Sequence, residues 1–145
     1  MTIRLKLLYE GACIPTRETE GSVGFDIRAY LKESVIIEPM STKKIGTGFA
    51  LALDKGYAAF IYARSGLGVN KGIVPGNCVG VIDSDYRGEV IVGLRNLSNE
   101  AYHVNPNDKI AQMVISKCEI GDIVVCEELD DTVRGVGGFG STGKE

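Results

Sequence analysis

The sequence predicts an all-β protein, either a sandwich or a barrel of short strands. Short apolar runs recur along the chain and are separated by Gly, Pro, Asn and Asp, which is typical of such folds. No segment has the sustained periodicity of an amphipathic helix. Glycine accounts for 19 of the 145 residues, about twice its usual share of roughly 7%, which indicates many turns.

The expected strands follow from the positions of the apolar residues. Near the N-terminus, Ile3, Leu5 and Leu7 alternate with Arg4 and Lys6, which predicts a half-buried strand. Similar alternating or apolar runs predict further strands at residues 23–30, 35–37, 45–53, 57–63, 79–82, 90–97, 102–104, 110–115 and 123–125.

The connections between these strands are polar and rich in turn-forming residues. Residues 64–72 are expected to form a glycine-spaced loop with room for one helical turn, and residues from 130 onward a glycine-rich tail. Since there is no internal repeat and no linker, we expect a single domain over residues 1–145. The barrel core would span 1–129, and residues 130–145 would be a mobile C-terminal arm that closes over an active site.

Composition excludes several classes of function. The net charge of −3 leaves no broad basic surface for nucleic acid or a membrane, so an anionic ligand would need a few local donors or a metal ion. No apolar run is long enough to span a bilayer, and we expect a cytoplasmic protein. The cysteines lack C-x-x-C spacing and are expected to be buried thiols, and the single histidine excludes most His-rich metal sites. The cysteines are Cys13, Cys78, Cys118 and Cys126.

A polar turn at residues 83–88 joins two apolar runs, which predicts a hairpin of strands 79–82 and 90–92. The turn carries Asp83, Asp85, Tyr86 and Arg87. A carboxylate at the end of an apolar strand is a candidate general base, because burial raises a carboxyl pKa toward neutrality. The alternative is that both aspartates only form the turn.

Two glycine-containing segments are candidate anion sites. In Arg64-Ser65-Gly66, glycine lets backbone N–H groups approach a phosphate, serine adds a hydroxyl donor and arginine adds a charged fork. An ordinary surface loop is the alternative. In residues 134–143, Phe139 stands alone among glycines, which favours docking of its ring on a ligand or a neighbour over a disordered tail.

Two polar residues within predicted strands are further candidates. Asp26 could orient water on Mg²⁺, which prefers oxygen ligands and keeps several of its waters, or it could simply face solvent. Gln112 lies in a strand in which simple alternation would also place a polar residue outward.

Taken together and in this order, five segments resemble the motifs of the trimeric dUTP pyrophosphatases (dUTPases). The resemblance covers nearly the whole chain, and its third and fifth segments are the most specific. The segments are Gly24-Phe25-Asp26-Ile27, Arg64-Ser65-Gly66, Gly80-Val81-Ile82-Asp83-Ser84-Asp85-Tyr86-Arg87-Gly88, Asp108-Lys109-Ile110-Ala111-Gln112 and residues 134–143.

The resemblance implies a β-clip or distorted jelly-roll-like barrel that forms a homotrimer with three active sites at subunit interfaces. It implies Mg²⁺-dependent hydrolysis of dUTP to dUMP and pyrophosphate, which keeps uracil out of DNA and supplies dUMP for dTMP synthesis. Asp83 would activate the water that attacks the α-phosphorus, and Asp26 would order the metal ion through water. One base, one metal ion and several donors suffice, because positioning and electrostatics dominate this chemistry.

The resemblance also implies roles in binding dUTP. Asn77 and the backbone of Val81, Ile82 and Asp83, with that of Ile91, would read the uracil edge, where cytosine would leave groups unpaired. Tyr86 would exclude a ribose 2′-hydroxyl. The phosphates would contact Arg64, Ser65, Gly66 and Gln112, and the arm would supply Arg134, Phe139, Gly140, Ser141 and Thr142, with the ring of Phe139 stacked on uracil.

Three alternatives remain open at this point. A dCTP deaminase-like enzyme shares the fold, but its chemistry would place a glutamate near the base, where this chain has Asp83. A nucleotide-binding module that has lost catalysis would not need Asp83, Arg64, Gln112 and Arg134 together. A lectin-like β-sandwich would have no use for the glycine-rich tail. Ala63 and Phe25 depart from the commonest family pattern, and neither carries a catalytic role.

Overall fold

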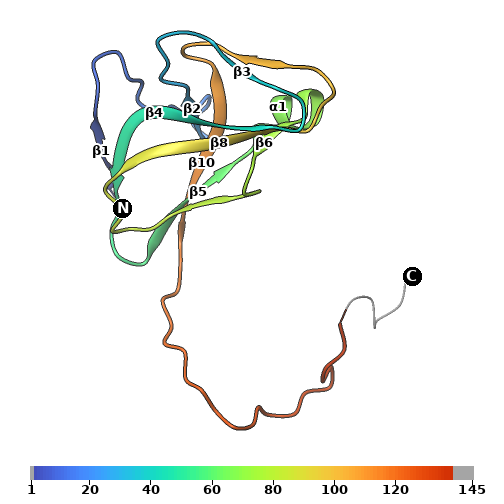
Figure 1. Cartoon of the computed structure of the whole chain (residues 1–145). Coiled ribbons are helices and arrows are strands. Elements are labelled where there is room, and N and C mark those ends of the chain that lie inside the picture. The colour runs from blue at the N-terminus through green and yellow to red at the C-terminus, as the bar shows by residue number, and fades with distance from the viewer. Residues whose placement is uncertain (1, 139–145) are drawn as a thin grey trace.

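The computed structural model describes residues 2–138, in which two four-stranded sheets and one two-stranded sheet enclose the core and one short helix lies at the rim (Figure 1). Every strand pairing is antiparallel. The elements are β1 (Arg4–Leu7), β2 (Phe25–Arg28), β3 (Val35–Ile37), β4 (Thr42–Ala52), β5 (Tyr57–Tyr62), α1 (Ser65–Lys71), β6 (Ile73–Pro75), β7 (Gly80–Ile82), β8 (Glu89–Asn96), β9 (Tyr102–Val104) and β10 (Lys109–Lys117).

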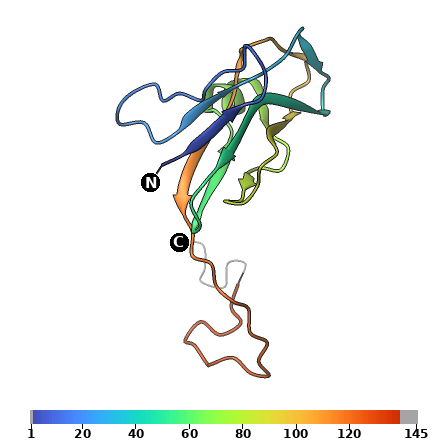
Figure 2. The ribbon, with the colours of Figure 1, turned by 90° about the vertical axis from the view of Figure 1, so that its left-hand side faces the viewer.

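The strands are arranged as two layers. One sheet has the order β1-β4-β8-β6, the other has the order β2-β10-β5-β7, and β3 pairs with β9 (Figures 1 and 2). Neighbours in both sheets come from distant parts of the sequence, as expected of a jelly-roll-like barrel. The prediction of an all-β fold is confirmed.

The core lies between the inner faces of the sheets. Along β8, the side chains of Val90, Val92, Leu94 and Asn96 are buried, and the residues between them are more exposed. This alternation follows from the pleat of a strand, which points successive side chains to opposite faces. The largest fully buried apolar side chains are Phe49, Ile27, Ile37, Ile45, Ile73, Leu94, Ile110 and Met113.

The prediction that the two strands flanking residues 83–88 pair with each other as a hairpin is wrong. Both of its strands form, but β7 pairs with β5 in one sheet and β8 pairs with β4 and β6 in the other. Residues 83–88 therefore cross from one layer to the other. Val79 and Val81 are exposed, so this run is not the buried strand that its apolar residues suggested.

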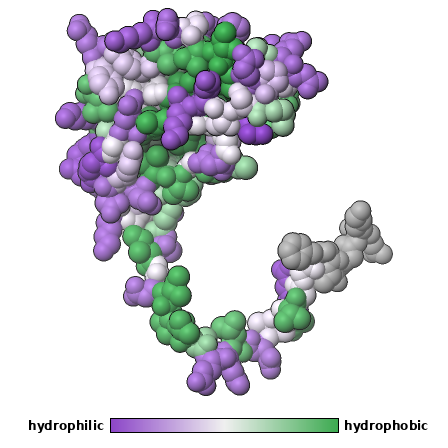
Figure 3. All heavy atoms as spheres, in the orientation of Figure 1, coloured by the Kyte–Doolittle hydropathy of each residue, from purple (hydrophilic) through white to green (hydrophobic). Residues whose placement is uncertain are grey.

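The chain leaves the barrel after β10. The expected strand at 123–125 is absent: Ile123, Val124 and Val125 are 98%, 80% and 94% exposed. Figure 1 shows residues 118–138 running away from the barrel, ahead of the expected boundary at 129, and Figure 3 shows apolar side chains along this stretch. These side chains are exposed because the segment does not pack against any other part of the described chain.

Two smaller expectations are corrected. The loop at 64–72 is mostly the seven-residue helix α1, which ends at Gly72 in the left-handed conformation with φ +67°. The cysteines are unpaired as expected, but Cys78 and Cys126 are exposed and Cys13 and Cys118 are only half-buried, so they are not core thiols. Among residues 2–138, no helix is long and apolar enough to cross a membrane.

Candidate active site

A buried carboxylate links three of the predicted site elements. Asp26 on β2 is 9% exposed. Its Oδ1 accepts a hydrogen bond of 2.8 Å from Nε of Arg64, the residue that precedes α1. Its Oδ2 lies 2.8 Å from Nζ of Lys109 on β10, which also pairs with Glu18. The carboxylate therefore orients the Arg64 guanidinium and holds two cations side by side.

Opposing influences act on the pKa of Asp26. Burial raises the pKa of this carboxyl, but the nearby Lys109 ammonium and Arg64 guanidinium outweigh burial, so the pKa lies below its usual value of 3.8. The pKa of Lys109 is raised, first by Asp26 and then by Glu18. Asp26 and Lys109 are thus both held in their charged forms near neutral pH.

Gln112 lies beside this cluster and is fixed by two contacts. On β10 it is in register with Asp26 on one side and Tyr62 of β5 on the other. Its Nε2 donates a hydrogen bond of 2.9 Å to the carbonyl oxygen of Ala63. A Cβ atom at Gly24 would lie only 2.7 Å from Oε1 of Gln112, so glycine is required there for this position of the amide. Gln112 and Arg64 therefore lie at one corner of the sheet.

Ser65 and Gly66 are the first two residues of α1 and are exposed. Their backbone positions follow directly from Arg64, whose carbonyl oxygen accepts hydrogen bonds from the N–H groups of Leu67 and Gly68. The structure therefore brings the expected phosphate contacts Arg64, Ser65, Gly66 and Gln112 to one corner, next to Asp26.

A second group of predicted residues lines a cavity of about 380 Å³ between β7 and the outer face of β8. Asn77 lies in the turn before β7, Val81 and Ile82 lie on β7, and Ile91 lies on β8. Gly80 is closely packed, because a Cβ atom there would lie 3.1 Å from Cβ of Ile61 and 3.6 Å from Nδ2 of Asn77. The lining of the cavity includes backbone groups of β7 and the amide side chain of Asn77.

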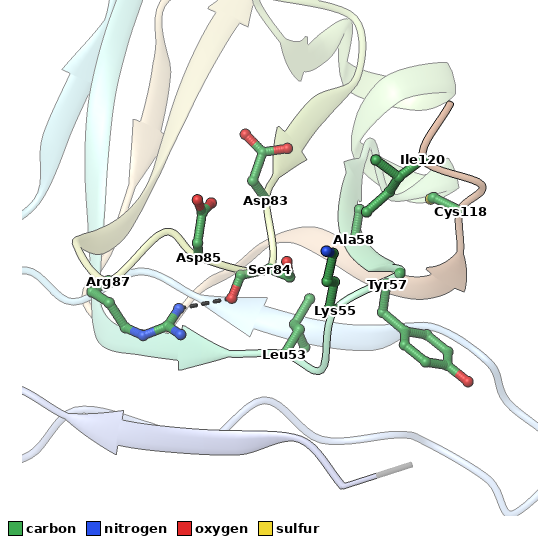
Figure 4. Close-up of a pocket in the computed structure, with 11 residues that line it drawn as sticks. Leu53, Lys55, Tyr57, Ala58, Asp83, Ser84, Asp85, Arg87, Cys118 and Ile120 are labelled. Atoms are coloured by element: carbon green, nitrogen blue, oxygen red, sulfur yellow. Dashed lines mark hydrogen bonds between the residues drawn. The ribbon is translucent and has the colours of Figure 1, made fainter. Parts of the chain in front are cut away.

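Asp83 lies at the far end of β7, where it faces a different cavity, of about 690 Å³ (Figure 4). Lys55, Asp85 and Arg87 contribute further charges to this cavity. Asp83 is exposed, so the burial that was expected around this carboxylate is not present in a single chain. Arg87 donates a hydrogen bond of 2.8 Å to the carbonyl oxygen of Ser84. This bond stabilises the turn, so the guanidinium is used within the turn and not for a ligand.

Tyr86 lies on the return side of the same turn and is 44% exposed. Its hydroxyl donates a hydrogen bond of 3.1 Å to the carbonyl oxygen of Glu89, the first residue of β8. The ring is therefore tied to the start of β8, the strand that carries Ile91 two residues further on.

Asp83 and the corner at Arg64 lie at opposite ends of β5. Ile82 pairs with Ala59, while Gln112 pairs with Tyr62, three residues further along β5. At about 3.3 Å per residue, Asp83 is roughly 13 Å from the level of Gln112 along the strand, and it is about 10 Å away across the sheet. One phosphate group cannot contact both residues in a single chain.

Only one of the predicted site residues of the arm, Arg134, lies within the described chain. Arg134 is exposed, and its Nε donates a hydrogen bond of 2.9 Å to the carbonyl oxygen of Gly137 in a local turn. Phe139, Gly140, Ser141 and Thr142 lie outside the described residues. The expected contacts of the arm with a nucleotide therefore stay predictions.

The described residues offer little direct coordination for a metal ion. No group of three or more His, Cys, Asp or Glu side chains in residues 2–138 could hold one. Both oxygens of Asp26 face cations, but Oδ2 is buried and accepts no hydrogen bond of good geometry within the described chain. Asp26 therefore does not fit direct coordination of a metal ion, and the expected contact through water stays a prediction.

Sequence reasoning missed several residues of the site. Lys109 was part of a recognised segment, but nothing local indicated that it would pair with Asp26. Thr42 and Lys44 line the smaller cavity from β4, because β4 lies next to β8 in the sheet. Gly24 was quoted only as a motif residue, and its close approach to Gln112 depends on the pairing of β2 with β10.

Comparison with known proteins gives a consistent result. The family model named dUTPase matches residues 10–143. The deoxyuridine 5′-triphosphate nucleotidohydrolase of Fusobacterium nucleatum is 47% identical over 143 residues and covers 98% of both chains. The enzyme of the same name from Nautilia profundicola is 47% identical over 144 residues, covering 99% of this chain and 100% of the relative.

Solved structures extend the similarity to the fold. A variant dUTPase of Staphylococcus bacteriophage 80alpha with dUpNHpp superposes with a TM-score of 0.89 at 25% identity, covering 99% of both chains. A dUTPase variant from phage phi11 of S. aureus, described with a structural Mg(II) ion, gives a TM-score of 0.81 at 25% identity, covering 90% of this chain and all of the other.

Proposed function

Because the chain belongs to the dUTPase family and is a dUTP diphosphatase, we propose that it hydrolyses dUTP to dUMP and pyrophosphate with Mg²⁺, using Asp83 to activate the attacking water. The product dUMP would serve dTMP synthesis, and removal of dUTP would keep uracil out of DNA. The proposal assigns base recognition to the cavity between β7 and β8, and phosphate binding to the corner at Arg64.

The observation that carries this proposal is the cavity of about 380 Å³ lined by Asn77, Val81, Ile82 and Ile91. Uracil presents an acceptor, a donor and an acceptor along one edge, which backbone groups of β7 and the Asn77 amide can match. Cytosine has a donor where uracil has the O4 acceptor, so it would leave a polar group of the cavity unpaired. Exclusion of the methyl group of thymine by sterics is assigned to the same cavity on the family resemblance alone.

The proposed hydrolysis is an attack by water on the α-phosphorus. Asp83 would accept a proton from that water as its oxygen bonds to phosphorus, while the bond to the bridging oxygen breaks and pyrophosphate leaves. Arg64, Ser65 and Gln112 would bind the phosphate chain through charged and neutral donors. Mg²⁺ bound to the triphosphate would supply positive charge that offsets the phosphate charge, and Asp26 is assigned to ordering its water shell on the family resemblance alone.

We place the complete active site between subunits of a homotrimer. Two observations support this arrangement. Asp83 lies too far from Gln112 along β5 for one nucleotide phosphate to reach both residues in the same chain. In addition, Ile123, Val124 and Val125 are almost fully exposed, and burying them against another copy would remove this apolar surface from water.

The arm would close the site over bound dUTP. Arg134 is exposed and has only a local backbone partner among the described residues, so its guanidinium is available for the terminal phosphate. Phe139, Ser141 and Thr142 are assigned to uracil stacking and phosphate contacts on the family resemblance alone. Closure of this kind excludes water and completes the set of donors.

One assay tests the proposed reaction. The protein with Mg²⁺ is incubated separately with dUTP, UTP, dCTP and dTTP, and pyrophosphate and ammonia are measured. We expect pyrophosphate from dUTP alone. Release of ammonia from dCTP would instead identify a deaminase, and a lack of turnover on every nucleotide would identify a binding module.

The role of Asp83 is tested by Asp83→Asn, which preserves size and removes the base. We expect kcat on dUTP to fall by at least about a hundredfold, the range of general-base contributions, with the Kd for dUTP within a few fold of wild type. Asp85→Asn in the same turn is the matched control and should retain most of the activity. An active Asp83→Asn variant would refute the assignment of the base.

A further inference from the structure

The side chain of Tyr86 is held by two residues that follow it closely in the sequence, Gly88 and Glu89. Its hydroxyl donates to the carbonyl oxygen of Glu89, and its ring lies directly over Gly88. A Cβ atom at residue 88 would lie 2.6 Å from Cζ of Tyr86, which is an impossible contact. The ring position therefore depends on a missing side chain at 88 and on a fixed acceptor at 89.

The side chain of Glu89 fastens that acceptor to the barrel. Oε1 of Glu89 accepts hydrogen bonds from the backbone N–H groups of Thr47, at 3.0 Å, and Gly48, at 2.8 Å. The pairing between β4 and β8 is interrupted here, since Gly46 pairs with Ile91 while Ala50 pairs with Glu89. The two N–H groups therefore lack partners in the strand ladder, and the carboxylate replaces those partners with charge-assisted hydrogen bonds.

Glu89 thus makes two kinds of contact, one through its side chain and one through its backbone. Its carboxylate anchors the first residue of β8 to the irregular part of β4, and its backbone carbonyl holds the Tyr86 hydroxyl. Two residues further on, Ile91 lines the smaller cavity. A shift of Glu89 would therefore move the tyrosine ring relative to the wall of the cavity.

We propose that Glu89 is a positioning residue that fixes the ring of Tyr86 and thereby sets the preference for a deoxyribonucleotide over a ribonucleotide. The inference rests on the proposed function, in which Tyr86 lies against the sugar. Glu89 has no contact with substrate in this account. It acts through the position of Tyr86, since a ring held in one place excludes a 2′-hydroxyl better than a ring that moves.

Glu89→Ala is the first test. We expect the ratio of kcat/KM for dUTP to that for UTP to fall by at least about tenfold, within the range by which one lost contact relaxes specificity. Tyr86→Phe should reduce the ratio similarly, and the double variant should be no worse than the single variants because both changes release the same ring. Glu89→Gln keeps an acceptor oxygen for Thr47 and Gly48 and should restore most of the ratio.

A purely structural role for Glu89 predicts a different outcome, in which Glu89→Ala lowers Tm and leaves the ratio unchanged. Asn96→Ala supplies the matched control. Asn96 is buried at the other end of β8, and its Nδ2 donates to the carbonyl oxygens of Ile37 and Glu100. This variant should lose stability without any change in the ratio.

Gly88→Ala moves the ring and leaves the carboxylate of Glu89 in place, so it covers the case in which Glu89→Ala does not fold. It should reduce the ratio as Tyr86→Phe does. A wild-type ratio in a folded Glu89→Ala variant, or in Gly88→Ala, would overturn the proposal.

A measurement without nucleotide separates this inference from the proposed function. With fluorotyrosine incorporated at the six tyrosines, the ¹⁹F signal of Tyr86 is assigned by its loss in Tyr86→Phe. We expect this signal to shift or broaden in Glu89→Ala and to return toward wild type in Glu89→Gln. An unchanged signal would refute the positioning role even if dUTP is the substrate, whereas wild-type protein that fails to hydrolyse dUTP would refute the proposed function alone.

Discussion

At the scale of single residues, Asp26 is the most constrained group of the candidate site. It is a buried carboxylate between the Arg64 guanidinium and the Lys109 ammonium, and these cations lower its pKa despite burial. The pairing does two things. It offsets the cost of burying the carboxylate, and it directs the Arg64 fork toward the corner that also contains Gln112.

The stability contributed by Asp26 has a defined pH dependence. Because its folded pKa lies below the usual 3.8, the contribution is fully present above that value and is lost as the pH falls through the lowered pKa. Asp26→Asn should lower the free energy of unfolding by about 2 kcal/mol near neutral pH, the size of hydrogen bonds to a charged group. The difference from wild type should shrink as the pH falls from the usual pKa through the lowered folded-state pKa, below which the carboxyl group is uncharged and resembles the amide of asparagine.

Urea unfolding of wild type and Asp26→Asn across acidic and neutral pH checks this expectation. Glu18→Gln is a suitable control, because Glu18 contacts the same Lys109 but is 63% exposed and should contribute little. A difference in stability between wild type and Asp26→Asn that stays constant into strong acid would contradict the account.

At the scale of elements, the segment from residue 83 to 88 and the arm have the largest effect on the site. The first connects β7 in one sheet with β8 in the other, and this separation opens the cavity assigned to the base. The arm leaves β10 with its apolar residues exposed, so its packing partner is not the described part of its own barrel.

Two truncations separate the functions of the arm. Removal of residues 134–145 should lower kcat/KM on dUTP by about a hundredfold, the typical effect of losing preorganised donors, while the oligomeric state and Tm stay close to wild type. Removal of residues 119–145 also deletes Ile123, Val124 and Val125 and should weaken the proposed trimer. Light scattering and thermal unfolding give the readouts, and a shorter truncation that unfolds the barrel would contradict this division.

At the scale of the whole molecule, the length of β5 sets the distance between the proposed base, Asp83, and the proposed phosphate-binding corner at Arg64. Asp83 is level with one end of the strand, and Gln112 is level with the other. Under the proposed function, a working site would need Asp83 of one chain and the Arg64 corner of another, and assembly would be part of catalysis.

Mixed trimers test this requirement. Asp83→Asn and Arg64→Ala are each expected to be nearly inactive alone. When equal amounts are unfolded together and reassembled, roughly a quarter of the sites should combine an intact Asp83 with an intact Arg64 from a different chain. If each site were built within one chain, every site would carry one defect and mixing would restore no activity.

The sequence by itself determined the all-β class, most of the strands and the residues that carry the family's motifs. These features are local: alternation of apolar residues, turn-forming glycines and aspartates, and short motifs are visible without knowing any neighbour in space. For this reason strands such as 35–37 and 102–104 were predicted with the bounds that the structure has.

Only the tertiary structure decided how these pieces meet. The tight turn at 83–88 suggested a hairpin, but pairing of β7 with β5 and of β8 with β4 depends on packing between residues far apart in the chain. The exposure of Asp83 and the anchor formed by Glu89 follow from that pairing, and the contact of Lys109 with Asp26 follows from the pairing of β2 with β10. Strand register is a non-local property, because a slip of one residue turns every side chain to the other face, and no local pattern contains that information.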